Sequence, residues 1–412
     1  MSTSTYIYIF GENDTKIWGL TGRERLQRML SSHQNIKLVN AVDTIPDTAP
    51  VLFLNANFLF DARVISAILG LEKKVVLNSN DDCPAAIRSD GNQAAPLLRN
   101  LNSSADHHHK FASLILPRIH LSDLNIDVQK NLKKKDPPYI FPISDSNRSL
   151  LENELFSGSY KGVTDLVTKW VWPVPAFWVT QLCVRHGWQP NHVTYASVVF
   201  AVLAGFAFWF GWFAIGLLMG WLMTFLDTVD GKLARVTVTS SRWGDILDHG
   251  LDIIHPPLWY LAWGVGLSTT ATPISGLGIL MVLMFIGYVG GRICEGIFHY
   301  WLAHFDMFIW EKLDSFNRLI TARRNPNLIL LTYGWLIDQP ALGLLLVVIW
   351  HLISTAILGW RLLTGWRTKQ TQGTLKSWLE DIDPARDRDL WAVKIFTRAP
   401  LHLTKPSAIS VN

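Results

Sequence analysis

The first third of the chain alternates short apolar runs with amphipathic, helix-like patterns. Tyr6–Phe10, Ile36–Ala41, Val51–Asn55 and Lys74–Leu77 predict strands, and Gly22–Leu30 and Asp61–Leu69 predict helices. Thr21 followed by Glu24 fits a capping box at the start of the first helix. Strands that alternate with helices predict a soluble α/β domain whose sheet is mainly parallel.

Residues 190–366 are different, because they contain long apolar runs rich in Trp, Phe, Leu and Gly. A membrane-spanning helix needs roughly 20 apolar residues. Six spans are predicted, the fifth interrupted by Asp338 and Pro340: 192–212, 213–234, 245–269, 273–302, 325–338 and 340–363. Ahead of them, residues 161–188 mix Trp with Lys and Arg, which predicts an amphipathic helix at the bilayer surface.

These patterns divide the chain into four segments. We expect a cytoplasmic α/β domain at 1–130, a linker at 131–154, a membrane domain at 155–366 and a cytoplasmic tail at 367–412. Lys133–Lys135 and Pro137–Pro138 indicate that the linker is exposed, and Leu390–Phe396 indicates one amphipathic helix in the tail. The adjacent His107, His108 and His109 favour a solvated loop over a metal site.

Charge distribution sets the expected orientation. The predicted outer loops, near Gly211, 268–275 and 338–341, contain no Lys or Arg, so both termini and the acidic ends of the spans are expected in the cytoplasm. The net charge of +4 is small and does not indicate a nucleic-acid partner. No cleavable signal peptide is expected, and three widely spaced cysteines fit a reducing compartment. The basic residues of the inner loops are Lys232, Arg235, Arg242, Lys312, Arg318, Arg323 and Arg324.

Four acids stand at the facing ends of two neighbouring predicted spans. Asp227 and Asp230 lie about 60° apart around their helix, and Asp248 and Asp252 about 40° apart around the next, so each pair shares one face. One Asp inside a span costs on the order of 2.5–3.5 kcal/mol, and converging carboxylates repel. A divalent cation turns that repulsion into attraction, and carboxylate oxygens suit Mg²⁺ or Mn²⁺. Two such ions could neutralise a diphosphate.

Small residues accompany the acids. Gly231 and Ala234 share the face of the first pair and leave room for a ligand, Gly244 does so one turn before Asp248, and Arg235 could grip a phosphate. The alternative is that the acids form ion pairs with Lys232, Arg235 and Arg242 at the membrane surface. Nearby, Asp245 could support the site or cap its helix, while His249 and His255 are interpreted as packing or second-layer residues.

This stretch resembles the signature of the CDP-alcohol phosphotransferase family, D-x-x-D-G-x-x-A-R followed after eight residues by G-x-x-x-D-x-x-x-D. Every signature position is filled, and the wider likeness covers about residues 155–365. The resemblance implies that an acceptor hydroxyl attacks the β-phosphorus of a CDP-linked donor and that CMP leaves. It also implies a homodimer, in a bacterial inner membrane with its lipids as surroundings.

The resemblance also implies roles by position. Asp227, Asp230 and Asp248 would bind two Mg²⁺ or Mn²⁺ ions, with Asp252 near the ions and acting as the general base. In members with a phosphorylated acceptor, basic residues bind its phosphate. Arg292, Arg323 and Arg324 are the candidates here, although Arg292 could instead pair with Glu295 on its own helix, near His299. The residues that would border the CDP group are Asn191, Thr194, Gly231, Ala234, Arg235 and Gly244.

The α/β domain resembles the Rossmann-like nucleotidyltransferase domain of bifunctional inositol-phosphate cytidylyltransferase/phospholipid synthases, over about residues 5–125. Active members have a glycine-rich loop after the first strand and a metal-binding Asp after a central strand. This chain has few glycines there, and Asn55 and Asn57 stand where the acid is expected. An amide cannot supply the charge that holds Mg²⁺ at a triphosphate, so the domain is predicted to be non-catalytic.

The leading hypothesis is therefore an enzyme, a transferase for substituted phosphate groups in phospholipid synthesis, with CDP-diacylglycerol as the simpler donor. The bifunctional relatives use CDP-inositol, so a water-soluble donor is the alternative. A hypothesis of another class is a membrane transporter or ion-binding protein. Ion pathways usually scatter acids at mid-membrane depth, whereas these acids cluster at the ends of two adjacent spans, which favours an enzyme.

Overall fold

The computed structural model describes residues 4–79, 83–102, 116–124, 126–240, 242–269, 276–383 and 386–397, and only the backbone of 100–102, 242, 243 and 245–249. The expected loop at His107–His109 lies outside these residues. The chain forms two compact units. The N-terminal unit comprises Met1–Asp127 with Asp136–Leu155, and the helical unit comprises Val128–Lys135 with Phe156–Asn412.

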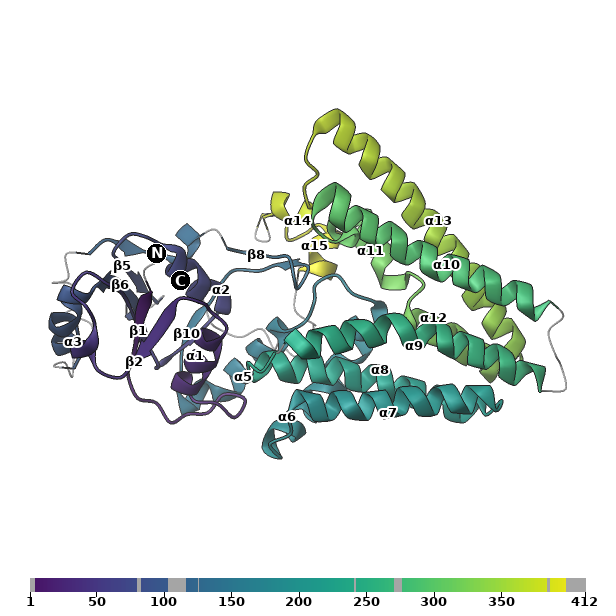
Figure 1. Cartoon of the computed structure of the whole chain (residues 1–412), viewed down its shortest axis with the longest axis horizontal. Coiled ribbons are helices and arrows are strands. Elements are labelled where there is room, and N and C mark those ends of the chain that lie inside the picture. Colours follow the sequence, from purple (N-terminus) through teal and green to yellow (C-terminus); the bar gives the residue numbers. More distant parts are fainter. Residues whose placement is uncertain are drawn as a thin grey trace. The chain divides into compact units, whose positions relative to one another are not determined.

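The N-terminal unit is built on a six-stranded sheet in the order β2-β1-β3-β6-β5-β7 (Figure 1). Its strand pairs are parallel except where β6 joins, because β6 runs antiparallel to both neighbours. The predicted α/β class is confirmed. The strands are β1 (Thr5–Phe10), β2 (Ile36–Val39), β3 (Pro50–Asn55), β4 (Phe58–Phe60), β5 (Val75–Asn78), β6 (Pro84–Asp90), β7 (Arg118–Ile119) and β10 (Ile140–Pro142), and the helices are α1 (Gly22–Ser31), α2 (Ala62–Gly70) and α3 (Ala94–Asn102).

Alternating side chains of the sheet fill two cores. Leu52 and Leu54 pack with α1 and α2 on one face, and Val51 and Phe53 belong to the core of the other face. The capping box predicted at Thr21 is confirmed, with Thr21 Oγ1 accepting from the Glu24 amide. β6 and α3 were not foreseen, because their Pro- and Ala-rich sequences carry little hydrophobic periodicity.

The helical unit contains four helices long and apolar enough to cross a membrane among the residues described: Pro190–Trp209, Phe213–Val236, Leu277–Ala303 and Pro340–Gln372. Helices also stand at the other two predicted spans, but six spans are not confirmed. α12 has 13 residues, about 20 Å, against a hydrocarbon core of about 30 Å. The helices are α5 (Arg148–Gly158, shared with the N-terminal unit), α6 (Pro173–Arg185), α7 (Pro190–Trp209), α8 (Phe213–Val236), α9 (Arg242–Ser268), α10 (Leu277–Ile297), α11 (Lys312–Ile320), α12 (Arg324–Leu336), α13 (Pro340–Gln372), α14 (Trp378–Asp381) and α15 (Trp391–Phe396).

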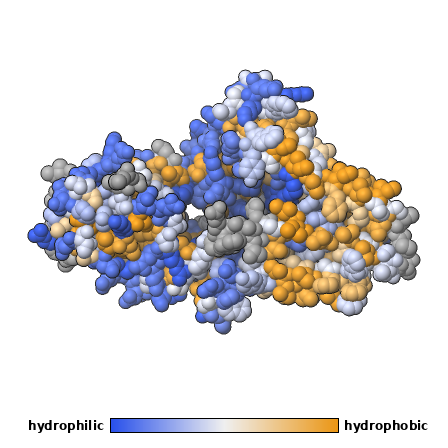
Figure 2. Space-filling model, in the orientation of Figure 1, coloured by the Kyte–Doolittle hydropathy of each residue, from blue (hydrophilic) through white to orange (hydrophobic). Residues whose placement is uncertain are grey.

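The long helices pack in two groups. α7 lies against α8 and α9, α10 lies along α13, and α12 contacts both α8 and α13 (Figure 1). Phe208, Trp259 and Trp263 are central in the core between them. Apolar side chains such as Phe206 and Ile286 face outward, and Figure 2 shows hydrophobic residues gathered over these helices. An outward apolar surface of this kind is what a lipid environment accommodates.

The amphipathic segment at 161–188 is only partly one helix. It contains a wide helical turn at Val167–Val171 and then α6, which begins at Pro173. Trp178 and Trp188 are exposed, as an interfacial segment requires.

The basic stretch expected as an exposed linker is instead a short hairpin of the helical unit. β8 (Val128–Gln129) pairs antiparallel with β9 (Lys134–Lys135). Lys134 is buried and its Nζ donates to the Gly158 carbonyl at 2.7 Å, while Lys135 Nζ donates to the Ile382 carbonyl at 2.6 Å. The expectation of exposure is wrong because backbone carbonyls of folded segments solvate these ammonium groups.

The tail after α13 also folds back on the unit. The amphipathic helix predicted near Leu390–Phe396 is present as α15. Its Val393 and Phe396 are buried in a core with Trp378 of α14 and with residues around α11. The tail therefore packs against the helices beside the site described below.

Candidate functional site

Two helices carry the signature residues, and a short connection joins them. α8 continues through the first acidic pair to Val236, and α9 begins six residues later at Arg242. Between them Val238 adopts a left-handed backbone with φ of 51°, which is unusual for a β-branched residue. The abrupt reversal places Asp227 on α8 within reach of the same side chain as Asp252 on α9.

That shared side chain is Arg324, at the first turn of α12. Its Nη2 lies 2.5 Å from Asp227 Oδ2, and its Nη1 lies 2.6 Å from Asp252 Oδ1. The side chain of Asp252 is 44% exposed, against 16% for Asp227. Two of the four signature acids thus converge on one cationic group, and Asp252 is the more accessible of the two.

The other two signature acids are Asp230 on α8 and Asp248 on α9. Asp230 Oδ2 accepts a hydrogen bond from Thr194 Oγ1 of α7 at 2.7 Å, so α7 also takes part in the site. Asp248 belongs to α9, but its side chain lies outside the described residues, as do those of Asp245 and His249. Among the described side chains no cluster of three or more His, Cys, Asp or Glu stands ready for a metal.

The chemistry of the described acids nevertheless fits a divalent cation. Asp227 and Asp252 come from different helices and present oxygens to one positive group, which is the arrangement that carboxylate ligands of Mg²⁺ or Mn²⁺ require. Asp230 lies one helical turn from Asp227 on the same helix. Asp227 and Asp252 could both contribute oxygens to an ion, and Asp230 and Asp248 lie on the same two helices.

A first cavity, of about 100 Å³, lies beside α7, α8 and the start of α9. All six residues predicted to border the CDP group line it. Thr239 and Ser240 of the connecting turn line it as well, and no pattern in the sequence had singled them out. We name it the signature cavity, lined by Pro190, Asn191, Thr194, Asp230, Gly231, Ala234, Arg235, Thr239, Ser240 and Gly244.

Gly231 keeps this cavity open. A Cβ placed on Gly231 would have only the Arg235 guanidinium nearby, with Nη1 at 3.5 Å, an ordinary contact. The side of the helix at Gly231 is therefore free space rather than packed core. Arg235 Nη1 also lies 3.4 Å from the Ser159 carbonyl, so its guanidinium is partly oriented by the backbone.

A second cavity, of about 260 Å³, is lined by Asp252 and is strongly charged. Arg292, Arg323 and Arg324, the predicted acceptor-phosphate candidates, all line it. Lys133, Lys161 and Arg318 line it too and were missed as site residues. We name it the basic cavity, lined by Lys133, Lys161, Val163, Thr164, Asp165, Asp252, Ile253, Pro256, Tyr288, Arg292, Glu295, Asp306, Arg318, Arg323, Arg324 and Asn325.

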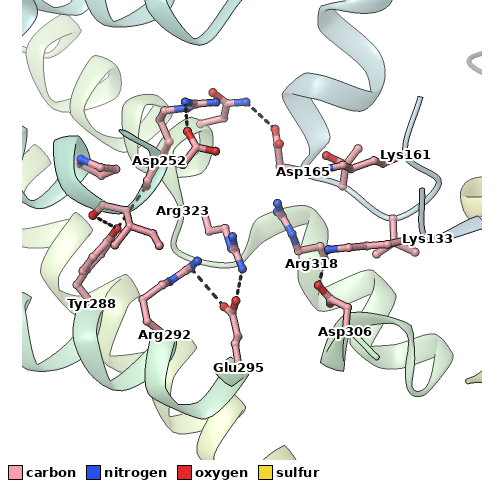
Figure 3. Close-up of a pocket in the computed structure, with 16 residues that line it drawn as sticks. Lys133, Lys161, Asp165, Asp252, Tyr288, Arg292, Glu295, Asp306, Arg318 and Arg323 are labelled. Atoms are coloured by element: carbon pink, nitrogen blue, oxygen red, sulfur yellow. Dashed lines mark hydrogen bonds and ion pairs between the residues drawn. The ribbon is translucent and has the colours of Figure 1, made fainter. Parts of the chain in front are cut away.

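Several basic side chains of the basic cavity are held by acids (Figure 3). Arg292 and Arg323 converge on Glu295, with Arg292 Nη2 3.2 Å from Glu295 Oε1. The helix-internal pair considered for Arg292 is therefore present, and Arg292 still borders the cavity. Lys133 Nζ lies 2.5 Å from Asp306 Oδ2. These pairs fix the cations in place at the cavity wall.

Arg318 has no ion pair of this kind among the described residues. Its Nε and Nη1 are buried and have no hydrogen-bond partner among the described residues. Burial lowers the pKa of Arg318 to about 10, which leaves the guanidinium charged at neutral pH. Figure 3 shows Arg318 pointing toward Asp165. Buried donors without acceptors are costly, so this corner of the cavity suits an anionic ligand.

Nearby cations lower the pKa values of two acids of the basic cavity, Asp165 and Asp306. Burial alone would raise the pKa of Asp165, but Arg318 and hydrogen bonds from Thr168 and Asn325 hold it below its ordinary value. The pKa of Asp306 is likewise held well below its ordinary value, because Lys133 outweighs the effect of burial. Both carboxylates are therefore charged at neutral pH, and the basic cavity is lined by charged groups of both signs.

His255 was expected as a packing residue, and it is buried in that manner. Its Nδ1 lies 2.6 Å from the Leu251 carbonyl, and its ring packs edge-on to Trp259. In the N-terminal unit, Asn55 Oδ1 accepts from the Asn57 amide at 3.0 Å, and Asn55 Nδ2 reaches the Pro84 carbonyl at 3.4 Å. These contacts use the Asn55 amide within the fold, and the absence of catalysis in this domain stays a prediction.

Comparison with known proteins bears on the segment that carries these acids. Residues 188–316 match the family described as CDP-alcohol phosphatidyltransferase. The matched segment contains α7, α8, α9 and α10, and therefore the whole signature cavity. A search of curated proteins found no match to the chain.

Proposed function

Residues 188–316 belong to the CDP-alcohol phosphatidyltransferase family, and we propose from this premise that the protein transfers a phosphatidyl group from CDP-diacylglycerol to the hydroxyl of a phosphorylated alcohol. The family consists of phosphotransferases, and its membership makes this chain a membrane-associated transferase of phospholipid synthesis in general terms. The donor, the acceptor and the dependence on Mg²⁺ or Mn²⁺ are the parts we propose.

The arrangement of the two cavities is the observation that carries the proposal. Asp230 lines the signature cavity, Asp252 lines the basic cavity, and Asp227 pairs with the same arginine as Asp252. One signature acid therefore lines each cavity, and Asp227 shares Arg324 with Asp252. A nucleotide in the signature cavity and an alcohol in the basic cavity would meet at these carboxylates, as a transfer between two substrates requires.

Each residue has a role in this scheme. Asn191, Arg235, Thr239 and Ser240 would hold the cytidine diphosphate, and Asp227, Asp230, Asp248 and Asp252 would hold Mg²⁺ or Mn²⁺. When bound, such ions neutralise the diphosphate and its developing charge. The acceptor hydroxyl gives its proton to Asp252 as its oxygen bonds to the β-phosphorus. The bond from that phosphorus to the oxygen of CMP breaks, and CMP leaves with the electron pair.

The charge of the basic cavity supports a phosphorylated acceptor. Six cationic side chains face four acidic ones, Asp252 among them. A phosphate monoester carries about −1.5 to −2 at neutral pH and provides three strong acceptor oxygens. Such a group would satisfy the buried Nε and Nη1 of Arg318, which a neutral alcohol could not do as well.

Release of CMP from CDP-diacylglycerol by the purified full chain tests the proposal. The assay would contain Mg²⁺ or Mn²⁺ and compare glycerol 3-phosphate and inositol phosphate with unphosphorylated glycerol and inositol. We expect release only with a divalent cation, and faster release with the phosphorylated acceptors. CDP-inositol as donor tests the alternative of a water-soluble substrate, and a folded protein that releases no CMP from either donor would favour a transporter.

A variant assigns the base. Asp252→Asn should abolish turnover while CDP binding stays measurable, because the amide cannot accept the hydroxyl proton. Asp338→Asn is a matched control. Asp338 has a left-handed φ of 57°, which Asn also adopts readily, and it borders neither cavity. Turnover at the wild-type rate in Asp252→Asn would contradict the assignment.

A further inference from the structure

One side chain belongs to both the acidic centre and the basic cavity. Arg324 bridges Asp227 and Asp252 at 2.5 and 2.6 Å, and it also lines the basic cavity. Only 15% of its side chain is exposed. A partly buried arginine stays charged, so it needs a negative partner in every state of the site.

The partners of Arg324 are the oxygens that a divalent cation would use. Each contact occupies one carboxylate oxygen, on Asp227 and on Asp252, so the guanidinium and a metal ion compete for the same ligands. A guanidinium brings one positive charge to these two acids, whereas a divalent ion brings two. Cation loading therefore displaces the guanidinium rather than joining it.

The displaced guanidinium has few acids left to turn to. Glu295 is already shared by Arg292 and Arg323, and Asp306 is paired with Lys133. A buried cation without a partner is costly. The space that Arg324 already borders is the basic cavity, where an anion from solution would be its new partner.

We propose that Arg324 is an exchangeable counter-ion, which neutralises Asp227 and Asp252 in the cation-free site and moves to an anion in the basic cavity when a divalent cation binds the acids. This inference rests on the proposed function, since the anion stands for the phosphate of the acceptor. The exchange couples the two ligands, and the coupling is reciprocal: each ligand tightens the other by the same factor. The acceptor is then held well only by a site whose acids are loaded.

Binding of Mn²⁺ to the full chain in detergent, measured by calorimetry, tests the exchange without turnover. Sulfate serves as the probe anion, because it is a tetrahedral dianion that does not precipitate Mn²⁺, and chloride at equal ionic strength is the reference. We expect sulfate to tighten Mn²⁺ binding about tenfold, within the range of about 5- to 150-fold that site coupling spans. Equal Mn²⁺ affinity in sulfate and chloride would overturn the inference, whatever any variant does.

Variants identify the residue. Arg324→Gln should bind Mn²⁺ more tightly than wild type in chloride, because its competitor is gone, and sulfate should add nothing. Arg324→Lys keeps the charge but presents a single ammonium, so an intermediate coupling is expected. Arg367→Gln is the control: it removes an equal charge from an exposed residue of α13 that lines neither cavity, and should leave Mn²⁺ affinity in chloride and its response to sulfate within about twofold of wild type.

Weaker Mn²⁺ binding in Arg324→Gln would contradict the exchange and assign Arg324 a supporting role at the acids. The outcome is separable from the proposed function. If the wild-type protein releases CMP but its Mn²⁺ affinity does not depend on sulfate, the exchange is overturned and the transferase proposal stands. Failure to release CMP from any donor overturns the transferase proposal even where the two ions are coupled.

Discussion

Gly231→Ala separates the folding role of the signature glycine from its role in binding. Gly231 lies inside α8, where alanine is more favourable than glycine by about 0.5–1 kcal/mol. The new methyl would meet only the end of the Arg235 side chain, at 3.5 Å, so no packing has to shift. We therefore expect the variant to be as stable as wild type or slightly more stable.

Binding should change in the opposite direction. The methyl projects into a cavity of about 100 Å³ where the donor is proposed to lie against the helix backbone. Forcing an extra methyl against a fitted partner costs roughly 1–3 kcal/mol. Affinity for CDP should then fall by about 5- to 150-fold, since 1.4 kcal/mol corresponds to a factor of ten.

Calorimetry with CDP and unfolding in detergent measure the two effects on one sample. Gly359→Ala is the matched control, because Gly359 lies inside α13 and a Cβ there meets nothing within 4 Å. Both variants gain the same helix propensity, but only Gly231→Ala should lose CDP affinity. A CDP affinity within twofold of wild type in Gly231→Ala would refute the location of the nucleotide in the signature cavity.

Two further predictions concern charges near the basic cavity. Lys133→Met should lower the unfolding free energy by about 1–2 kcal/mol, because it leaves Asp306 unpaired. Adding Asp306→Asn should restore most of that loss, which a double-mutant cycle in unfolding measures. Additive effects of the two changes would mean that the 2.5 Å pair contributes no coupling. Burial lowers the pKa of Lys169 from 10.5 to about 8. Below pH 8 the buried charge therefore opposes folding, and this penalty disappears as the pH rises from about 8 to 10.5. The unfolding free energy of wild type relative to Lys169→Met should therefore rise by up to about 3 kcal/mol over that range, and a difference that stays flat or falls would refute the lowered pKa.

The acidic centre could be predicted from spacing because it depends on local geometry. Intervals of three and four residues place each pair of acids on one helix face wherever the helix lies. The structure agrees in bringing Asp227 and Asp252 to one side chain, and Asn191, Thr194 and Gly244 to one cavity. Both α8 and α9 pack mainly against α7, and their acids meet through Arg324 of α12.

The basic cavity could be predicted only in part. Arg292 and Arg323 were predicted because the family that the chain resembles binds an acceptor phosphate with basic residues, and because an arginine within an apolar span, such as Arg292, is costly. Lys133 and Arg318 were not, because a lysine in a Lys- and Pro-rich stretch and an arginine in an amphipathic helix have ordinary explanations at the surface. Their place at the cavity depends on how the hairpin of β8 and β9 and the helix α11 pack, which involves residues far apart in the chain.

The sequence by itself determined the division into an α/β part and a helical membrane part, and the signature acids with their glycines, since periodicity and spacing act within one helix or strand. Only the tertiary structure decided that Arg324 bridges Asp227 and Asp252. It also decided that Lys133, in a hairpin outside the family segment, lines the same cavity as Asp252, and that the C-terminal tail packs against α11, which carries Arg318 of that cavity. The physical reason is that charge pairing and cavity shape depend on which distant side chains share a buried space, and hydrophobic patterning carries no information about that.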